Sequence, residues 1–223
     1  MSESSRGAHP RLTIRHVLAD AYRAILALDS PLLRVIRDLT LRPGQFVRRY
    51  VEGEREGVVG PIKYALLTLT VSLIAGQLGR KLYPLELGPR DDAAWIEALY
   101  AASDLRTYWA LPVLIPTAML QRLLFWRRGF NLAETYVFLA YVMGHFFWLW
   151  VVGALLPKDI RDQTLISVLS SVIPCVYVAW AYCGFYGRRS LSVVVRGLIV
   201  FMTFLFGIAI SISIVAGLQT MRR

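Results

Sequence analysis

The sequence predicts an all-α fold, a polytopic transmembrane helix bundle of about five spans with a basic amphipathic N-terminal region. The first observation behind this prediction is composition. The chain of 223 residues is 56% hydrophobic and 18% charged, whereas soluble domains are roughly 45–50% apolar and roughly 25% charged. The second is distribution, because charge is densest in residues 1–61 and long apolar segments follow. This composition excludes a disordered chain and a disulfide scaffold, and it disfavours a soluble enzyme.

The apolar segments are long enough for five membrane spans. A helix needs roughly 20 mostly apolar residues to cross about 30 Å of hydrocarbon. In the second segment Pro112 and Pro116 interrupt the helix, so a kinked or partly re-entrant helix is expected there. The predicted spans are 62–79, 108–126, 135–156, 164–186 and 197–218.

Lysine and arginine in the connections predict the orientation. With the N-terminus inside, the inner connections carry seventeen of these residues and the outer connections carry eight, as the positive-inside rule requires. Residues 1–61 lack the short basic and apolar regions of a signal peptide, so the first span is expected to be an uncleaved anchor. We therefore predict a multi-pass protein of the bacterial inner (plasma) membrane, with a cytoplasmic region 1–61 and a transmembrane bundle 62–223.

The N-terminal region shows helical periodicity. Apolar residues recur at helical spacing within 14–26, 32–39 and 46–51, with arginines on the opposite faces. The Ser30-Pro31 pair predicts a helix start, and Pro43-Gly44 predicts a turn. These helices lie on the cytoplasmic leaflet, or they form a cap packed on the inner mouth of the bundle, or they do both. In the first case the leaflet contacts are Arg34, Arg37, Arg48 and Arg49. A further short helix is expected in the outer loop, over 91–103.

The net charge of +10 comes almost entirely from arginine. Because this charge adjoins apolar spans and no nucleic-acid recognition motif accompanies it, anionic lipids are the expected partner and nucleic acid is not. Cys175 and Cys183 lie about 12 Å apart along one helix, too far for a disulfide. They are expected to be packing residues.

The N-terminal part contains a pattern made up of Asp38-Leu39, Arg42-Pro43-Gly44, Tyr50, Gly53, Pro61 and Tyr64. In this pattern the chain resembles an uncharacterised family of bacterial multispan inner-membrane proteins. Longer members of that family carry an N-terminal zinc ribbon, whereas no cysteine precedes Cys175 in this chain, so no zinc ribbon is expected. The resemblance covers roughly residues 11–75 and implies a multispan membrane protein without a defined activity.

His145 is the one histidine within a predicted span. An ionisable group at membrane depth indicates a function by default, here a proton relay, a ligand or a haem axial residue. The alternative, which we favour, is a neutral histidine hydrogen-bonded to a carbonyl of a neighbouring helix. His9 and His16 lie outside the spans, and no metal-binding spacing occurs. No metal and no cofactor are therefore expected.

Three charged residues and one glutamine lie near the predicted span ends. Glu134 is expected to cap a helix N-terminus, or to close a cytoplasmic gate opposite Arg122, Arg127 or Arg128. Arg196 is expected to extend its side chain to the headgroups, or to bind a lipid phosphate. Gln121 is expected to lie at the interface or to line a polar cavity. Together, Arg122, Glu134, His145 and Arg196 are the candidates for cavity or lipid contacts.

The sequence contains no hydrolase, phosphate-loop or metal motif, which predicts that the protein is not an enzyme. The leading hypothesis is a non-enzymatic membrane protein, either an accessory subunit or a membrane-organising protein. It would act through helix–helix and lipid contacts, with another membrane protein or a second copy as its partner. The alternative is a small transporter or lipid-handling protein with a polar cavity between the spans.

Overall fold

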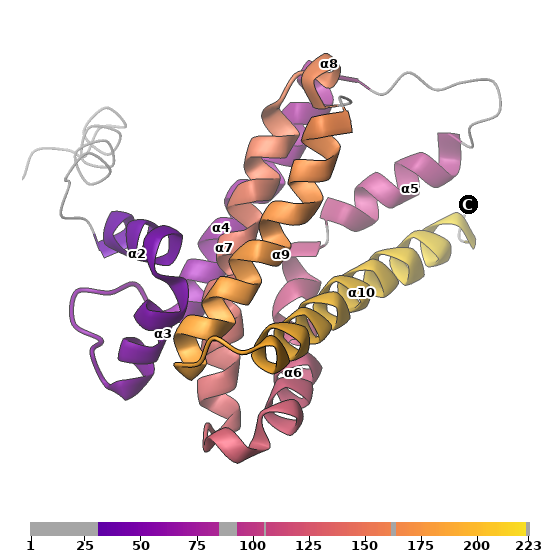
Figure 1. Ribbon diagram of the computed structural model, residues 1–223. Helices are drawn as coiled ribbons and strands as arrows, with labels where there is room; N and C mark the ends of the chain where they lie inside the picture. The colour runs from indigo at the N-terminus through magenta and orange to yellow at the C-terminus, as the bar shows by residue number, and fades with distance from the viewer. Residues whose placement is uncertain (1–30, 85–92, 105, 162–163, 222–223) are drawn as a thin grey trace, which may run out of the picture.

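The computed structural model describes residues 31–84, 93–104, 106–161 and 164–221. The described residues are helical and contain no strand, which confirms the all-α prediction (Figure 1). The elements are α2 (Pro31–Leu41), α3 (Pro43–Glu52), α4 (Pro61–Leu82), α5 (Ala93–Asp104), α6 (Arg106–Leu124), the 3₁₀ turn η1 (Trp126–Arg128), α7 (Leu132–Leu155), α8 (Lys158–Arg161), α9 (Thr164–Tyr186) and α10 (Leu191–Met221).

Within these ranges, four helices are long and apolar enough to cross a membrane: α4, α7, α9 and the Leu191–Leu218 part of α10. They correspond to four of the five predicted spans. The remaining one, 108–126, falls on α6, whose apolar part Trp109–Leu124 is shorter. Pro112 and Pro116 both lie inside this helix. At 1.5 Å per residue its apolar part is about 24 Å long, less than the roughly 30 Å of a bilayer core.

Helices α4 and α7 run parallel and pack with their backbones in close contact. A Cβ on Gly144 would lie 3.2 Å from the Cα of Ala65, and a Cβ on Gly79 would overlap the carbonyl of Ala154. From the first contact to the second, the residue numbers rise in both helices, so α4 and α7 point in the same direction. The chain must therefore run back from the end of α4 to the start of α7. It returns through α5 and α6, and α9 then descends beside α7 (Figure 1).

Helices α2 and α3 pack against the side of the bundle at its lower half, next to α7 and α9 (Figure 1). Their buried side chains Val35, Leu39, Phe46 and Val47 belong to the same hydrophobic core as the bundle helices. Residues 31–52 therefore pack on the bundle, as the second interpretation expects, although they lie against its side and not over its mouth. The periodic segment 14–26 lies outside the described residues.

The Pro43-Gly44 pair does not make the turn that its sequence predicts. Only Arg42 separates α2 from α3, and Pro43 begins α3, where a proline needs no N–H partner. Gly44 then lies one residue into the helix, against α9. A Cβ on Gly44 would overlap the backbone of Ala181 and Phe185, and a Cβ on Gly184 would lie 3.1 Å from the Cα of Gly44. The glycine is therefore used for close packing.

Helix α10 runs obliquely away from the upright helices, and α5 lies beside its C-terminal half (Figure 1). Ala98, Ala102 and Ala216 are buried between the two helices. Arg80 at the end of α4 binds both carboxylate oxygens of Asp104, at 2.7 and 2.8 Å. The helix expected in the outer loop is thus present as α5, and this ion pair joins it to the end of α4.

Replacing Gly44 by alanine tests the contact between α3 and α9. The added methyl group meets backbone atoms that cannot rotate away, so we expect the free energy of unfolding to fall by about 1–3 kcal/mol. Gln45→Ala is the matched control, because Gln45 is the exposed neighbour in the same helix. The measurement is the unfolding of each purified protein in mixed micelles. Equal stability of the two alanine variants would contradict the close approach.

Candidate functional site

Four side chains form a hydrogen-bonded chain where α2 meets α4 and α7; we call them the polar junction. The Trp148 indole N–H donates to the Tyr64 hydroxyl over 3.2 Å. The Tyr64 hydroxyl lies 2.7 Å from His145 Nδ1. His145 Nε2 lies 3.2 Å from the hydroxyl oxygen of Thr40. The junction therefore links the end of α2 to two helices of the bundle.

The directions of these bonds determine the tautomer of His145. Thr40 donates its own proton to the Ile36 carbonyl over 2.8 Å, so its oxygen accepts from the Nε2–H of His145. A neutral imidazole with its proton on Nε2 has a lone pair on Nδ1, which accepts the Tyr64 hydroxyl proton. Every polar hydrogen of the junction then has an acceptor, and a single neutral tautomer satisfies all the bonds.

Tyr177 of α9 completes the contact with α2. Its ring packs on His145, with centroids 5.4 Å apart, and its hydroxyl donates to the Leu39 carbonyl over 3.3 Å. The last carbonyls of a helix have no partner within the helix. For the Leu39 carbonyl near the end of α2, the Tyr177 hydroxyl is that partner. From the sequence we favoured a hydrogen bond between His145 and a carbonyl of a neighbouring helix. His145 instead bonds two hydroxyl groups, that of Thr40 on α2 and that of Tyr64 on α4.

Tyr141, one turn below His145 on α7, holds the connection between α3 and α4. Its hydroxyl donates to the Val59 carbonyl over 2.6 Å. Phe46 and Tyr50 of α3 pack edge-on against its ring, with centroids 5.2 and 5.3 Å away. Helix α7 thus contacts each element from α2 to α4 with an aromatic or polar side chain.

A second buried polar cluster joins α6 to α9. Gln121 is fully buried. Its amide donates to the Tyr186 hydroxyl over 3.1 Å and accepts from the Tyr182 hydroxyl over 2.8 Å. Phe125 stacks on Tyr186 with a centroid distance of 4.1 Å. The cavity role expected for Gln121 is wrong, because its amide is buried between two helices. Its position at the membrane interface stays a prediction.

Three of the four cavity candidates bond backbone groups near the lower end of the bundle. Glu134 forms a capping box with Asn131: its carboxylate accepts the Asn131 N–H (2.7 Å), and the Asn131 side chain accepts the Glu134 N–H (2.8 Å). This confirms the expected capping. Arg196 donates to the Leu124 carbonyl at the end of α6 over 2.9 Å, a role that the sequence did not indicate. Arg122 donates to the Phe130 carbonyl over 3.3 Å.

The four candidates do not surround one cavity. His145 lies eleven residues beyond Glu134 on α7, a rise of about 16 Å, and bonds the polar junction instead. Both of its ring nitrogens are engaged. In the part of the chain that the structure describes, no group of three His, Cys, Asp or Glu side chains is placed to hold a metal ion. The polar junction can join helices. It leaves no lone pair on the His145 imidazole for a ligand.

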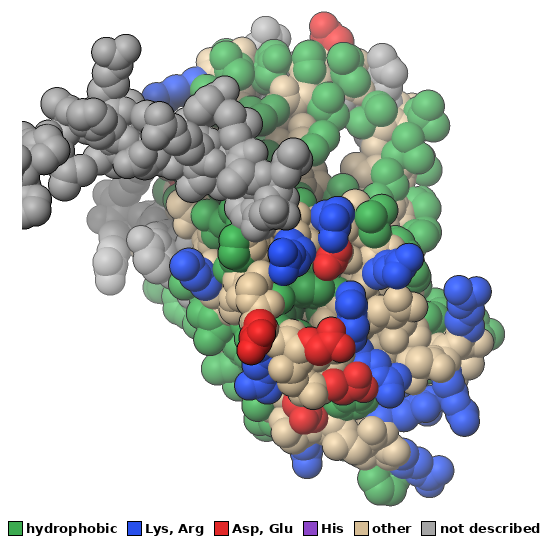
Figure 2. Space-filling view, turned by 90° about the vertical axis from the view of Figure 1, so that its left-hand side faces the viewer, with side chains coloured by type: hydrophobic (Ala, Val, Ile, Leu, Met, Phe, Trp, Pro, Cys, Tyr) green, Lys and Arg blue, Asp and Glu red, His purple; other side chains and the backbone are tan. Residues whose placement is uncertain are grey.

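The four leaflet candidates lie on a surface of mixed charge. Three of them pair with acids of their own segment: Arg37 with Asp38 (3.2 Å), Arg48 with Glu52 (2.8 Å) and Arg49 with Glu54 (3.9 Å). Arg34 is exposed on α2. Figure 2 shows basic and acidic side chains interspersed over the lower half of this face, with apolar side chains above them. Their contact with anionic lipid stays a prediction.

Sequence reasoning missed Thr40, Trp148 and Tyr177 as members of the site. One signal was available: Tyr64 carries the family resemblance and also lies inside an apolar span. A polar group at that depth needs a partner. Its partners lie 81 and 84 residues away in the chain, and periodicity does not identify partners at that separation.

Tyr64→Phe tests the polar junction. It keeps the ring but leaves the Trp148 N–H and His145 Nδ1 without a partner, so we expect a loss of about 1–2 kcal/mol in the free energy of unfolding. Tyr100→Phe is the control, because Tyr100 is a partly exposed tyrosine on α5, outside the junction. Thr40→Val combined with Tyr64→Phe should lose less than the sum of the two single losses. Additive losses would show that the two residues do not share a network.

The comparisons with known proteins locate one similar segment. A family model described as "Protein of unknown function (DUF3667)" matches residues 29–73, which agrees with a resemblance to an uncharacterised family. No curated protein and no solved structure matches the chain. The matched segment contains α2, α3 and the first half of α4. It therefore includes Thr40, Gly44 and Tyr64, three of the residues through which this segment contacts α7 and α9.

Proposed function

We propose that this membrane protein is a non-enzymatic accessory subunit that binds another membrane protein through the outer faces of α9 and α10. One observation carries the proposal. In the most apolar 18-residue windows of α9 and α10, 18% and 22% of residues are buried, compared with 39% and 44% in α4 and α7. The two helices therefore have apolar faces that the other described residues do not cover.

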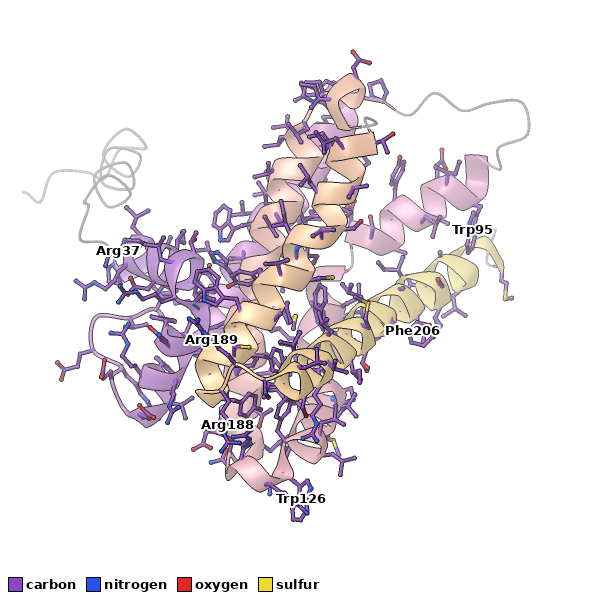
Figure 3. The ribbon with its side chains drawn as sticks, viewed as in Figure 1. Arg37, Trp95, Trp126, Arg188, Arg189 and Phe206 are labelled. Atoms are coloured by element: carbon purple, nitrogen blue, oxygen red, sulfur yellow. The ribbon has the colours of Figure 1, made fainter. Side chains whose placement is uncertain are left out.

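The composition of the uncovered face of α10 favours a protein partner over lipid alone. Small residues lie exposed among its large apolar side chains, among them Thr203, Ala209 and Ser213. Helices in membranes associate through small residues because these let two backbones approach closely. Phe206, which is 66% exposed, projects from the same helix (Figure 3). We propose that the partner presents an apolar transmembrane helix to this face.

The transport alternative has less support. A transporter with a polar cavity needs polar groups that converge between its spans. The four candidates for that role instead lie at two levels of the bundle, and each bonds backbone or neighbouring side chains. Two surface depressions at α6 and the start of α7 are lined mainly by apolar side chains.

A photo-crosslinking amino acid at Phe206 tests the docking face in native membranes. We expect one defined crosslinked protein, and the mass of the product distinguishes a different partner from a second copy. The matched control is the same substitution at Trp126, an aromatic residue that is 68% exposed at the lower end of the molecule (Figure 3). Native mass spectrometry of the gently extracted protein then gives the stoichiometry. Crosslinking to lipid alone at Phe206 would refute the accessory-subunit proposal.

We further propose that the protein lies in a bacterial inner membrane with its N-terminus in the cytoplasm, as its arginine distribution favours. The test uses Gln45→Cys on α3 and Glu97→Cys on α5, both exposed positions, in a background that lacks Cys175 and Cys183. An impermeant maleimide should label Glu97→Cys in intact spheroplasts and Gln45→Cys only after lysis. The reverse pattern would contradict this orientation.

A further inference from the structure

An apolar groove runs along α6 and the first turns of α7. Its upper part has a volume of about 500 Å³. A second depression of about 370 Å³ adjoins it toward the lower end, since Leu132 lines both. The side chains of the upper part are those of Ile115, Ala118, Leu132, Ala133, Tyr136 and Val137.

The lower depression combines an arginine with an exposed tryptophan. Arg122, Trp126 and Met119 line it, and the Arg127 guanidinium lies 5.2 Å from the centre of the Trp126 ring. Trp126 projects from the lower end of the molecule (Figure 3). Tryptophan and arginine together are typical of the depth at which lipid headgroups lie.

The charges at this end of the groove favour an anion. Arg122 uses one N–H for the Phe130 carbonyl, and a guanidinium has five N–H donors. Arg127 and Arg128 follow in η1. The nearby Glu134 carboxylate already accepts the Asn131 N–H in its capping box. Three arginines therefore lie at this end of the groove with one carboxylate, and that carboxylate already accepts a backbone hydrogen bond.

The spacing of the two parts matches a phospholipid. Seven residues of α6 separate Ile115 in the upper part from Arg122 in the lower part, a rise of about 10 Å. A phosphate at Arg122 would leave an acyl chain to extend along Met119 toward Ile115 and Val137. We propose that this groove binds one anionic phospholipid, with its phosphate on Arg122 and an acyl chain between α6 and α7. The inference rests on the membrane location and not on the protein partner proposed above.

Native mass spectrometry of the purified intact protein, titrated with phosphatidylglycerol or with phosphatidylcholine of the same chains, tests the headgroup. We expect one phosphatidylglycerol to bind more tightly than phosphatidylcholine, and Arg122→Gln to weaken phosphatidylglycerol binding about 5- to 10-fold. Arg188→Gln, an exposed arginine at the same end outside the groove, should leave it unchanged. Equal binding of the two lipids, or equal loss in the two variants, would overturn the proposal.

A second pair of variants tests the acyl-chain part. Ala133→Phe fills the groove and should weaken phosphatidylglycerol binding, whereas Ala209→Phe, at an exposed position on α10, should not. Glycerol 3-phosphate, which has no acyl chain, should not displace the lipid. Displacement by it would assign the arginine end to a free phosphate and refute the lipid site. Since the titration uses the isolated protein, its result does not depend on whether Phe206 finds a protein partner.

Discussion

The backbone contact between Gly44 of α3 and Gly184 of α9 determines where the N-terminal helices lie. Neither residue has a side chain, so the two helices approach until their backbones touch. Such close contact adds dispersion attraction between the two helices over the area where they touch. The contact places Phe46 and Val47 in the core of the bundle. It also brings the end of α2 to α7, where the polar junction forms.

The polar junction accounts for an ionisable residue inside a span without assigning it a reaction. His145 has a partner at each ring nitrogen, and the hydroxyl and indole groups around it complete a chain of bonds with one consistent direction. A polar group without a partner at this depth would be costly. The same bonds that remove this cost also join α2, α4 and α7, so the polar residues stabilise one arrangement of the three helices.

Two kinds of surface remain on the outside of this assembly. The lower end carries arginines and tryptophan beside a groove, and there a charged headgroup and an acyl chain fit together. The face of α10 is apolar with interspersed small residues, and there another helix fits better than a charged ligand. We propose that the first surface binds a lipid and that the second binds a protein partner. Binding at either surface needs no group from the buried polar clusters.

The sequence by itself determined the features that depend on neighbours in the chain. Hydropathy predicted five spans, and four of them are present as helices long and apolar enough to cross a membrane. Ser30-Pro31 indicated the start of α2, and Glu134 was expected to cap a helix N-terminus, as it does. Only the tertiary structure decided the long-range pairs: Thr40 with His145, Gln121 with Tyr182, and Arg196 with the Leu124 carbonyl. The physical reason is that periodicity shows which face of a helix is apolar, whereas a partner depends on how distant helices pack. Pro43-Gly44 illustrates this difference, because its local pattern indicates a turn and its packing against Gly184 requires a helix.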